Sequence, residues 1–308
     1  MNYPNIKGIK YHYKSVSIEH LNELQEDFDK INRKGILSNH NIYRCYLSNK
    51  QFVIPETIPD AKSLIILATS TRMMFANFHL NGRIFNIMIP PPYYDDGLTF
   101  EELESLVTNK IIKEPSYNIV KARDQLHLKI LAVRSGLARY GRNNICYIEG
   151  MGSFFSLHAY YTNYKMEHDD WQDLKMLDTC KNCTYCLESC PTNAIRGDPF
   201  VIDAGKCIPL YNEIDGEFPN WMDINVHNAL MGCMKCQYLC PENREQIKKA
   251  GQFEDISEEE TKMLLMGEFT NDLVTSLSSK IKMFDPSDGI RFLPRLKRNL
   301  EVLIKYGS

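Results

Sequence analysis

The sequence predicts an α+β protein in which an α/β domain precedes a cysteine-rich module and a helical carboxy-terminal segment. Ser63 to Thr69 form a short, continuous apolar run, which is typical of a strand buried on both faces of a sheet. Asn81 and Gly82 join two β-prone runs, Met73 to Leu80 and Arg83 to Ile89, as a two-residue hairpin turn. Strands and helices therefore alternate before the cysteines begin.

Helical spacing of apolar residues and capping patterns add the helices. They predict helices from Ser17 to Gly35, from Thr99 to about Ile112, from Ser116 past Arg134, and from Ser257 to Gly267. The resulting division is an α/β domain over residues 1–165, a cysteine-rich module over 166–250 and a helical segment over 251–308 that packs back on the core.

Composition limits the function classes. The chain has 308 residues, of which 44% are hydrophobic and 24% charged, so it is long enough for two globular domains. The amino terminus has no signal-peptide pattern and no stretch is apolar enough to span a membrane, so we expect a cytoplasmic protein without a membrane partner. A net charge of -3 gives no general attraction to nucleic acid.

The cysteine spacing is the most specific signal in the chain. Cys180, Cys183, Cys186 and Cys190 form the pattern C-x2-C-x2-C-x3-C and are followed by proline, which is the spacing of two-cluster ferredoxins. In that pattern three cysteines hold one [4Fe-4S] cluster and the fourth reaches a second cluster. The first motif therefore predicts a second one.

The second motif is incomplete. Cys233, Cys236 and Cys240 repeat its last three positions, but Leu230 stands where the first cysteine belongs. Cys207 is the only cysteine between the motifs, so we assign it the vacant position. The predicted ligands are Cys180, Cys183, Cys186 and Cys240 for the first cluster, and Cys190, Cys207, Cys233 and Cys236 for the second.

Zinc and disulfides are the alternatives. Zinc sites use paired knuckles and do not need this run with its trailing proline, and disulfides require an oxidising compartment that nothing in the sequence indicates. The two remaining cysteines, Cys45 and Cys146, are expected to be small buried side chains.

A glycine- and arginine-rich segment precedes the cysteines. Glycines let a backbone approach a ligand closely, and arginines with backbone amides bind anionic groups, although a helix end followed by a strand explains the segment equally well. The candidate cofactor-binding residues are Arg134, Gly136, Arg139, Tyr140, Gly141, Arg142 and Asn143.

The order of these motifs resembles the epoxyqueuosine reductases and their relatives, the cobalamin-dependent reductive dehalogenases. The resemblance rests on Ser135 to Asn143, Gly152-Ser153, Asp203 with Cys207, Gly232 to Asn243, and the closing segment Arg291 to Asn299. It implies a nitroreductase-like first domain that holds cobalamin against a ferredoxin-like double-cluster domain. Flavin in the first domain is a less favoured cofactor.

The sequence differs from the family in the motif that supplies the proton donor. The family's Asp-Tyr-His motif is absent, and the nearest match is Asp124 with His127. On an uninterrupted helix these two residues share one face, which makes them the candidate catalytic pair, with Tyr140 and Tyr147 behind them.

Two functions follow. The first is an oxidoreductase in which a ferredoxin or flavodoxin supplies electrons that pass through the clusters to a cofactor. The alternative is an electron-transfer or reductive-activation protein without its own substrate site, whose partner is a corrinoid protein. A tRNA partner would need a local basic patch, for which Arg291, Arg295, Lys297 and Arg298 are candidates, although a solvated helix face is the favoured interpretation.

Overall fold

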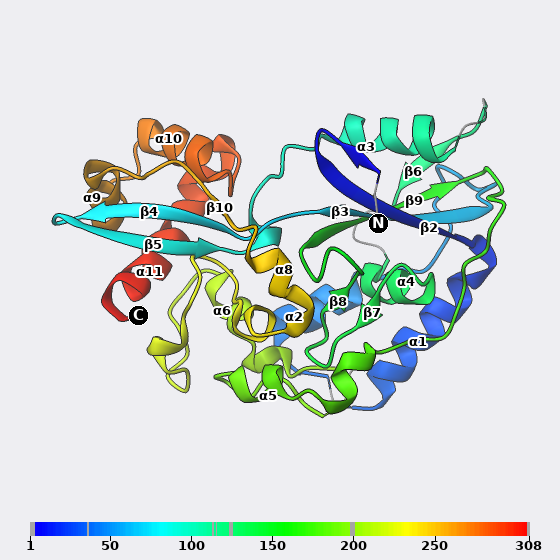
Figure 1. The fold of residues 1–308 in the computed structure, drawn as a ribbon, viewed down its shortest axis with the longest axis horizontal. Coiled ribbons are helices and arrows are strands. Elements are labelled where there is room, and N and C mark those ends of the chain that lie inside the picture. Colours follow the sequence, from blue (N-terminus) through cyan, green and yellow to red (C-terminus); the bar gives the residue numbers. More distant parts are fainter. Residues whose placement is uncertain are drawn as a thin grey trace. The chain divides into compact units, whose positions relative to one another are not determined.

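The computed structural model describes residues 4–35, 37–112, 114, 116–122, 126–197 and 201–306 (Figure 1). It divides into two compact units, each built from separate stretches of the chain. The first unit contains Met1–Thr71, Gly97–Thr184 and Ile195–Gly205, and the second contains Arg72–Asp96, Tyr185–Ala194 and Lys206–Ser308. The division into three consecutive domains stays a prediction.

A five-stranded antiparallel sheet forms the centre of the first unit (Figure 1). Its order is β1 (Asn5–Ile6), β2 (Ile9–Ser17), β3 (Ser63–Ser70), β9 (Phe155–Thr162) and β6 (Ile119–Lys121). Alternate residues of β3 belong to two different hydrophobic clusters, Leu64 and Ile66 to one and Ile65 and Leu67 to the other. The buried central strand that the apolar run predicts is therefore confirmed.

Helices complete both clusters of the first unit. Leu24 of α1 (Leu21–Arg33) and Leu131 of α4 (Leu128–Arg134) belong to one, and Leu103 of α3 (Phe100–Leu106) belongs to the other. The Thr99–Glu102 capping box begins α3 as predicted, and a π-helical turn, η3 (Val107–Ile111), continues it. The remaining elements are η1 (Ile18–His20), α2 (Asn41–Ser48), β7 (Arg139–Tyr140) and β8 (Cys146–Tyr147).

The helix predicted from Ser116 past Arg134 is wrong. Residues Ile119–Lys121 form β6, which pairs with β9, and the helix α4 begins only at Leu128. The β-branched pair Ile119-Val120 suits an edge strand, and pairing with a strand about 40 residues later in the chain outweighs the local helical spacing.

The second unit is built on the predicted hairpin. Its strands β4 (Met74–Leu80) and β5 (Arg83–Ile89) pair in register, and Asn81 and Gly82 both have positive φ, at 52° and 71°. Because a two-residue turn of this kind needs two positive φ angles, the sequence Asn-Gly is well suited to it. The short β10 (Gly251–Gln252) adds parallel to β4.

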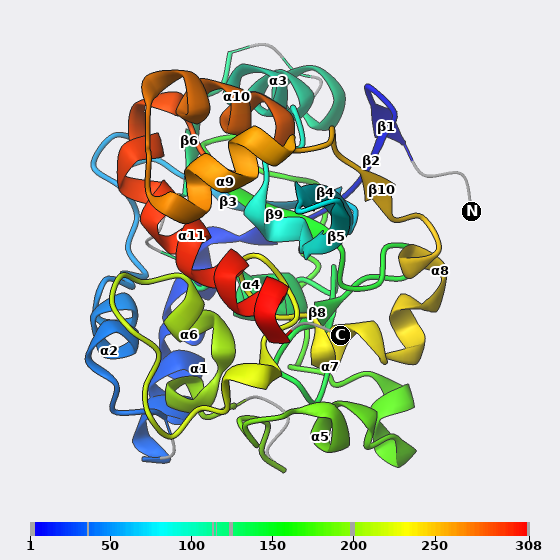
Figure 2. The same ribbon diagram turned by 90° about the vertical axis from the view of Figure 1, so that its left-hand side faces the viewer.

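Three helices pack with this hairpin (Figure 2). They are α9 (Glu258–Met266), α10 (Asn271–Ile281) and α11 (Gly289–Tyr306). The capping box of Ser257 with Glu260 and the left-handed Gly267, with φ 84°, bound α9 as predicted. The shared core includes Phe78, Ile87, Leu264, Leu277 and Leu300.

The cysteine-rich segments carry only short elements. These are η4 (Asp178–Asn182), α5 (Tyr185–Ser189), η5 (Ala204–Lys206), α6 (Ile208–Asn212), η6 (Ile224–Val226), α7 (Lys235–Tyr238), η7 (Pro241–Asn243) and α8 (Arg244–Ile247). Two further short helices lie outside these segments, η2 (Pro91–Tyr93) and η8 (Pro286–Asp288). Among the described residues, no helix is both long and apolar enough to cross a membrane.

A carboxamide network ties these segments to α11. Asn299, which is 1% exposed, donates through Nδ2 to the carbonyls of Asn212 and Leu230, at 2.9 Å each. Asn212 in turn donates to the carbonyl of Gly232 at 2.6 Å and accepts from its N–H at 2.9 Å. The long carboxy-terminal helix therefore fixes the backbone that leads into Cys233.

Replacing Asn299 with Ala should destabilise the second unit, because two buried carbonyls lose their donor. We expect the free energy of unfolding to fall by about 1–3 kcal/mol, measured as a lower denaturation midpoint. Glu301→Ala is the control, since the Glu301 side chain is 49% exposed on the same helix. Equal midpoints for the two variants would contradict a structural role for the network.

Candidate functional site

The eight predicted cluster ligands can be assigned to the compact units one by one. Cys180 and Cys183 belong to the first unit, and the other six cysteines belong to the second. None of the ten cysteines, all of which lie in the described residues, takes part in a disulfide bond. In the described part of the chain, no three His, Cys, Asp or Glu side chains converge as ligands of a single metal ion.

Three predicted ligands of the second cluster lie near one another in the second unit. Burial raises the pKa of the Cys233 thiol, and the charge of nearby Cys190 raises this pKa further. Burial raises the pKa of Tyr93 well above its ordinary value, and the nearby Cys207 and Cys233 raise it further. Cys190 therefore lies near Cys233, and Cys207 and Cys233 both lie near Tyr93, while the role of these cysteines as ligands stays a prediction.

Packing of α5 on α7 brings two of these cysteines together. The two short helices contact each other, and the Ser189 hydroxyl donates to the Lys235 carbonyl at 3.4 Å. Cys190 directly follows α5, and Cys233 lies two residues before α7. The helices thus hold the end of the first cysteine motif against the start of the second.

Hydrogen bonds reach two of the sulfur atoms. Asn228 donates from Nδ2 to the Cys233 Sγ at 3.2 Å, while its Oδ1 accepts from the Met234 N–H at 2.9 Å and fixes the amide. The Ala194 N–H donates to the Cys190 Sγ, also at 3.2 Å. Such donors stabilise negative charge on a thiolate. No motif in the sequence marks Asn228, so sequence reasoning missed it.

The two cysteines outside the motifs differ. Cys146 is buried, and burial raises the pKa of its thiol to about 12, so this side chain is unreactive, as expected. Cys45 is exposed, and its predicted burial is therefore wrong. It lies on the short surface helix α2, where Leu47 is the buried residue.

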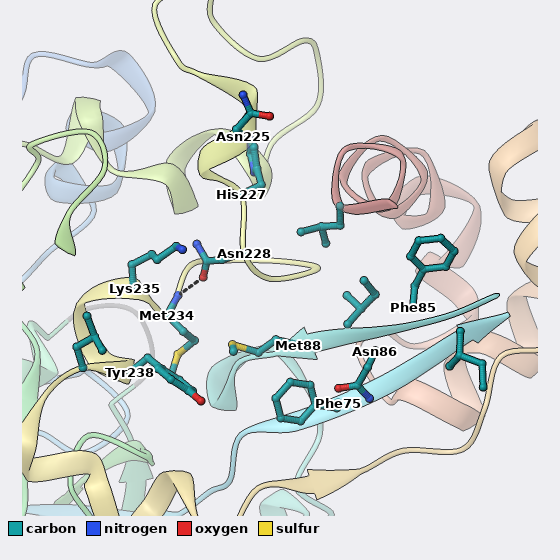
Figure 3. A pocket seen from close by; sticks show the side chains of 14 residues that line it. Phe75, Phe85, Asn86, Met88, Asn225, His227, Asn228, Met234, Lys235 and Tyr238 are labelled. Atoms are coloured by element: carbon teal, nitrogen blue, oxygen red, sulfur yellow. Dashed lines mark hydrogen bonds between the residues drawn. The ribbon is translucent and has the colours of Figure 1, made fainter. Parts of the chain in front are cut away.

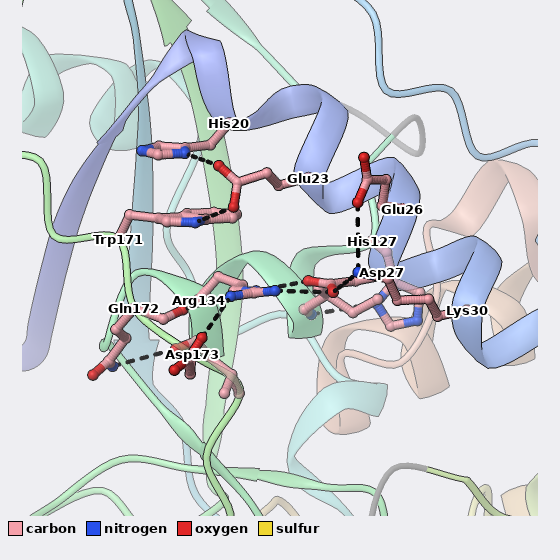
Figure 4. A network of polar contacts seen from close by, with 12 residues as sticks. His20, Glu23, Glu26, Asp27, Lys30, His127, Arg134, Trp171, Gln172 and Asp173 are labelled. Carbon is pink, nitrogen blue, oxygen red and sulfur yellow. Dashed lines mark hydrogen bonds and ion pairs between the residues drawn. The ribbon is translucent and has the colours of Figure 1, made fainter.

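Arg134, the first candidate cofactor residue, is paired inside the first unit (Figure 4). Its Nε and Nη2 donate to the two carboxylate oxygens of Asp27, at 2.6 and 2.9 Å. The side chains of Arg134 and Asp27 are only 13% and 6% exposed. A third donor, Nη1, reaches the Gln172 carbonyl at 3.1 Å. This guanidinium is a structural link between α1 and α4.

The candidate glycines make room for neighbouring side chains. A Cβ on Gly136, whose φ is 72°, would lie 2.5 Å from Nε2 of Gln172. A Cβ on Gly141 would lie 2.6 Å from the Tyr147 ring and from Oδ1 of Asn143. Packing within the first unit therefore accounts for both glycines.

The other candidates also have partners in this unit. Asn143 is buried and donates to the Tyr147 hydroxyl at 2.9 Å, and Tyr140 is 2% exposed. Arg139 pairs with Asp178 at 3.0 Å, and Arg142 donates to the Cys180 carbonyl. The two arginines thus brace the turn that carries Cys180. Cofactor binding by the segment stays a prediction.

The structure describes only one residue of the candidate catalytic pair, His127. Asp124 lies outside the described residues. His127 is the N-cap of α4, where Nδ1 accepts from the Ile130 N–H at 3.4 Å. Burial lowers the pKa of His127 to about 3, so its imidazole is neutral at neutral pH. A neutral, buried capping residue is a poor general acid.

The basic carboxy-terminal residues are only partly solvated. Arg298 donates to the carbonyls of Tyr211, at 3.0 Å, and Gly216. Arg295 donates to the Glu213 carbonyl at 2.9 Å and pairs with Asp215. The favoured interpretation, a solvated helix face, is therefore wrong for these two arginines. Their guanidinium groups instead hydrogen-bond to the segment that follows Cys207.

Comparison with known proteins agrees with the cysteine pattern. Residues 179–243 match the family model described as a 4Fe-4S double cluster binding domain. An epoxyqueuosine reductase of Cellulophaga algicola is 25% identical over 244 residues, which cover 77% of each chain. An epoxyqueuosine reductase of Staphylococcus aureus is 33% identical over 194 residues, 61% of this chain and 50% of the relative.

Solved structures share the fold. Epoxyqueuosine reductase from Bacillus subtilis aligns over 96% of this chain and 77% of its own, with a TM-score of 0.62 and 19% identity. A structure of the enzyme with an epoxyqueuosine-modified tRNA-Tyr stem loop gives 0.65 and 18% identity over the same shares. The predicted resemblance and the two [4Fe-4S] clusters are confirmed, and the relatives are oxidoreductases.

Proposed function

We propose that this chain is an iron–sulfur reductase of the epoxyqueuosine reductase type, which acts on a modified base of tRNA in the cytoplasm. Its two [4Fe-4S] clusters pass single electrons from an external ferredoxin or flavodoxin to the reacting cofactor. The observation that carries the proposal is the double cysteine motif within a chain that is similar to named reductases over 77% of its length. The nitroreductase-like character of the first unit is part of the same proposal.

The proposed cluster ligands are the cysteines that the motif spacing predicts. Cys180, Cys183, Cys186 and Cys240 hold one cluster, and Cys190, Cys207, Cys233 and Cys236 hold the other. Eight thiols are a donor set that suits two cubanes. The proximity of Cys190, Cys207 and Cys233 supports the second set.

The residues around the clusters supply charge stabilisation and support. Asn228 and the Ala194 N–H donate to ligand sulfurs, so they favour the reduced, more negative cluster. In the first unit, Arg142 holds the Cys180 carbonyl while Arg139 pairs with Asp178. Together these contacts position the cysteine loops.

Cobalamin is the acceptor that the resemblance implies, and it would supply reductive chemistry at cobalt. Four of the residues predicted to bind it, Arg134, Gly136, Gly141 and Asn143, contact neighbouring side chains within their own unit. Corrinoid binding by this segment therefore rests on the family resemblance.

The second candidate function is electron transfer or reductive activation for a corrinoid protein. One observation favours it: the Asp-Tyr-His motif is absent, and the substitute His127 is a neutral helix cap. A protein that only passes electrons needs no proton donor of its own.

Activity on tRNA separates the two functions. Anaerobic protein with both clusters, cobalamin and a chemical reductant should convert epoxyqueuosine in tRNA to queuosine, detected by nucleoside mass spectrometry. Cys45→Ala should keep full activity, since Cys45 is an exposed thiol outside both motifs. Intact clusters with no conversion under these conditions would favour the electron-transfer function.

Cys207 tests the ligand assignment. Replacement by Ala should lower the iron and sulfide content by about one cubane, because the second cluster loses one of its four thiolates. Cys45→Ala is again the matched control. Two complete clusters in Cys207→Ala would refute the assignment of this residue.

Asn228 should tune the second cluster. Asn228→Leu keeps the approximate volume and removes the donor to Cys233 Sγ, so we expect the midpoint potential of that cluster to become more negative. Redox titration followed by electron paramagnetic resonance measures this shift. Iron analysis must first show both clusters present, and an unchanged potential would rule out the tuning role.

A further inference from the structure

A cavity of about 560 Å³ lies within the second unit (Figure 3). The hairpin strands contribute residues such as Phe75 and Met88 to its lining, and the segment around the second cysteine motif contributes seven residues between positions 225 and 239. Leu303 of α11 also lines it. A cavity of this volume suits a ligand of nucleotide or drug size.

One wall of the cavity is the open edge of a sheet. The sheet order is β10-β4-β5, so β5 is an edge strand, and the Met88 carbonyl accepts from the Leu230 N–H at 2.8 Å on the side away from β4. Because hydrogen-bonding direction alternates along an antiparallel strand, the backbone groups of Asn86 and Ile84 point to the same side. A strand edge of this kind presents N–H donors and C=O acceptors in turn. It can therefore donate to the carbonyl oxygens of an imide and accept from the imide N–H.

His227 points to a missing partner. It is 5% exposed, and within the part of the chain that the structure describes neither ring nitrogen has a hydrogen bond. Its ring lies 4.2 Å from that of Phe218, and burial lowers its pKa to about 4, so the imidazole is neutral. Burying a polar group without a hydrogen-bond partner costs folding free energy. The unpaired ring nitrogens of His227 therefore indicate a ligand or water bound in the cavity that this residue lines.

The lining combines apolar rings with one cation. Phe75, Phe85 and Tyr238 supply aromatic surface, Met88 and Met234 supply thioethers, and Lys235 supplies a positive charge (Figure 3). Aromatic and thioether groups favour a flat ring system, and the ammonium favours an anionic substituent. A flat, amphiphilic anion is the ligand class that these groups recognise.

The cavity also adjoins the second cysteine motif. Asn228 lines the cavity and donates to the Cys233 Sγ, so a single side chain separates the cavity from a predicted cluster ligand. This position suits a redox-active ring better than a nucleotide without redox chemistry.

We propose that the cavity binds flavin mononucleotide, whose flat isoalloxazine ring carries an imide and whose side chain carries a phosphate. The edge of β5 meets the imide, the aromatic and methionine side chains hold the ring, and Lys235 pairs with the phosphate. The choice of a redox-active ring rests on the proposed electron-transfer role of the clusters.

Equilibrium dialysis of flavin mononucleotide against the anaerobic protein with both clusters tests the site. We expect one flavin per chain at micromolar concentration. Lys235→Met should weaken flavin mononucleotide binding by about tenfold and leave riboflavin, which lacks the phosphate, unaffected. Lys248→Met is the matched control, because this exposed lysine pairs with Glu245 on α8 and does not line the cavity.

A blocking variant keeps the test decisive. Asn225 is exposed at the rim of the cavity, so Asn225→Trp adds a ring there without disturbing the core and should abolish flavin binding. Undiminished binding in Asn225→Trp, equal effects of the two lysine variants, or no binding at all would overturn the proposal. Iron analysis of each preparation is independent of flavin binding, so loss of the clusters and loss of the flavin site are distinguishable.

Discussion

The second unit depends on one buried carboxamide. Asn299 donates its two amide hydrogens to the carbonyls of Asn212 and Leu230, which both lie within the long segment between Cys207 and Cys233. Short helices of four or five residues cannot hold such a loop by themselves, since isolated turns of helix are unstable in water. The hydrophobic core holds α11 in place, and Asn299 in the middle of this helix therefore positions the segment between the cysteines.

This arrangement separates two contributions to the site. Metal binding usually supplies much of the folding free energy of a cysteine-rich loop. Here, in addition, Asn212 exchanges two hydrogen bonds with Gly232, and Arg298 holds the carbonyls of Tyr211 and Gly216. The backbone between Cys207 and Cys233 is consequently positioned by protein contacts in addition to any metal.

Local signals predicted the local elements well. The Asn81-Gly82 turn, the buried strand β3 and two capping boxes all follow from residues that are neighbours in sequence. The failures concern distant partners. Pairing of β6 with β9 replaced a helix, and the arginines of α11 contact carbonyls more than 80 residues away, which no periodicity reveals. Spacing predicts the cluster cysteines, whereas no sequence pattern marks Asn228 or the cavity beside it.

The glycine- and arginine-rich segment shows why residue type alone does not define a binding site. Glycine and arginine suit close approach to an anion, but they equally suit close approach of one part of a protein to another. Gln172 occupies the space beside Gly136, and Asp27 takes two donors of Arg134. Because Arg142 reaches the carbonyl of Cys180, the segment still serves the cluster region, through the backbone of a predicted ligand. A motif can thus be shared with cofactor-binding proteins and act by supporting the loop that holds the cofactor.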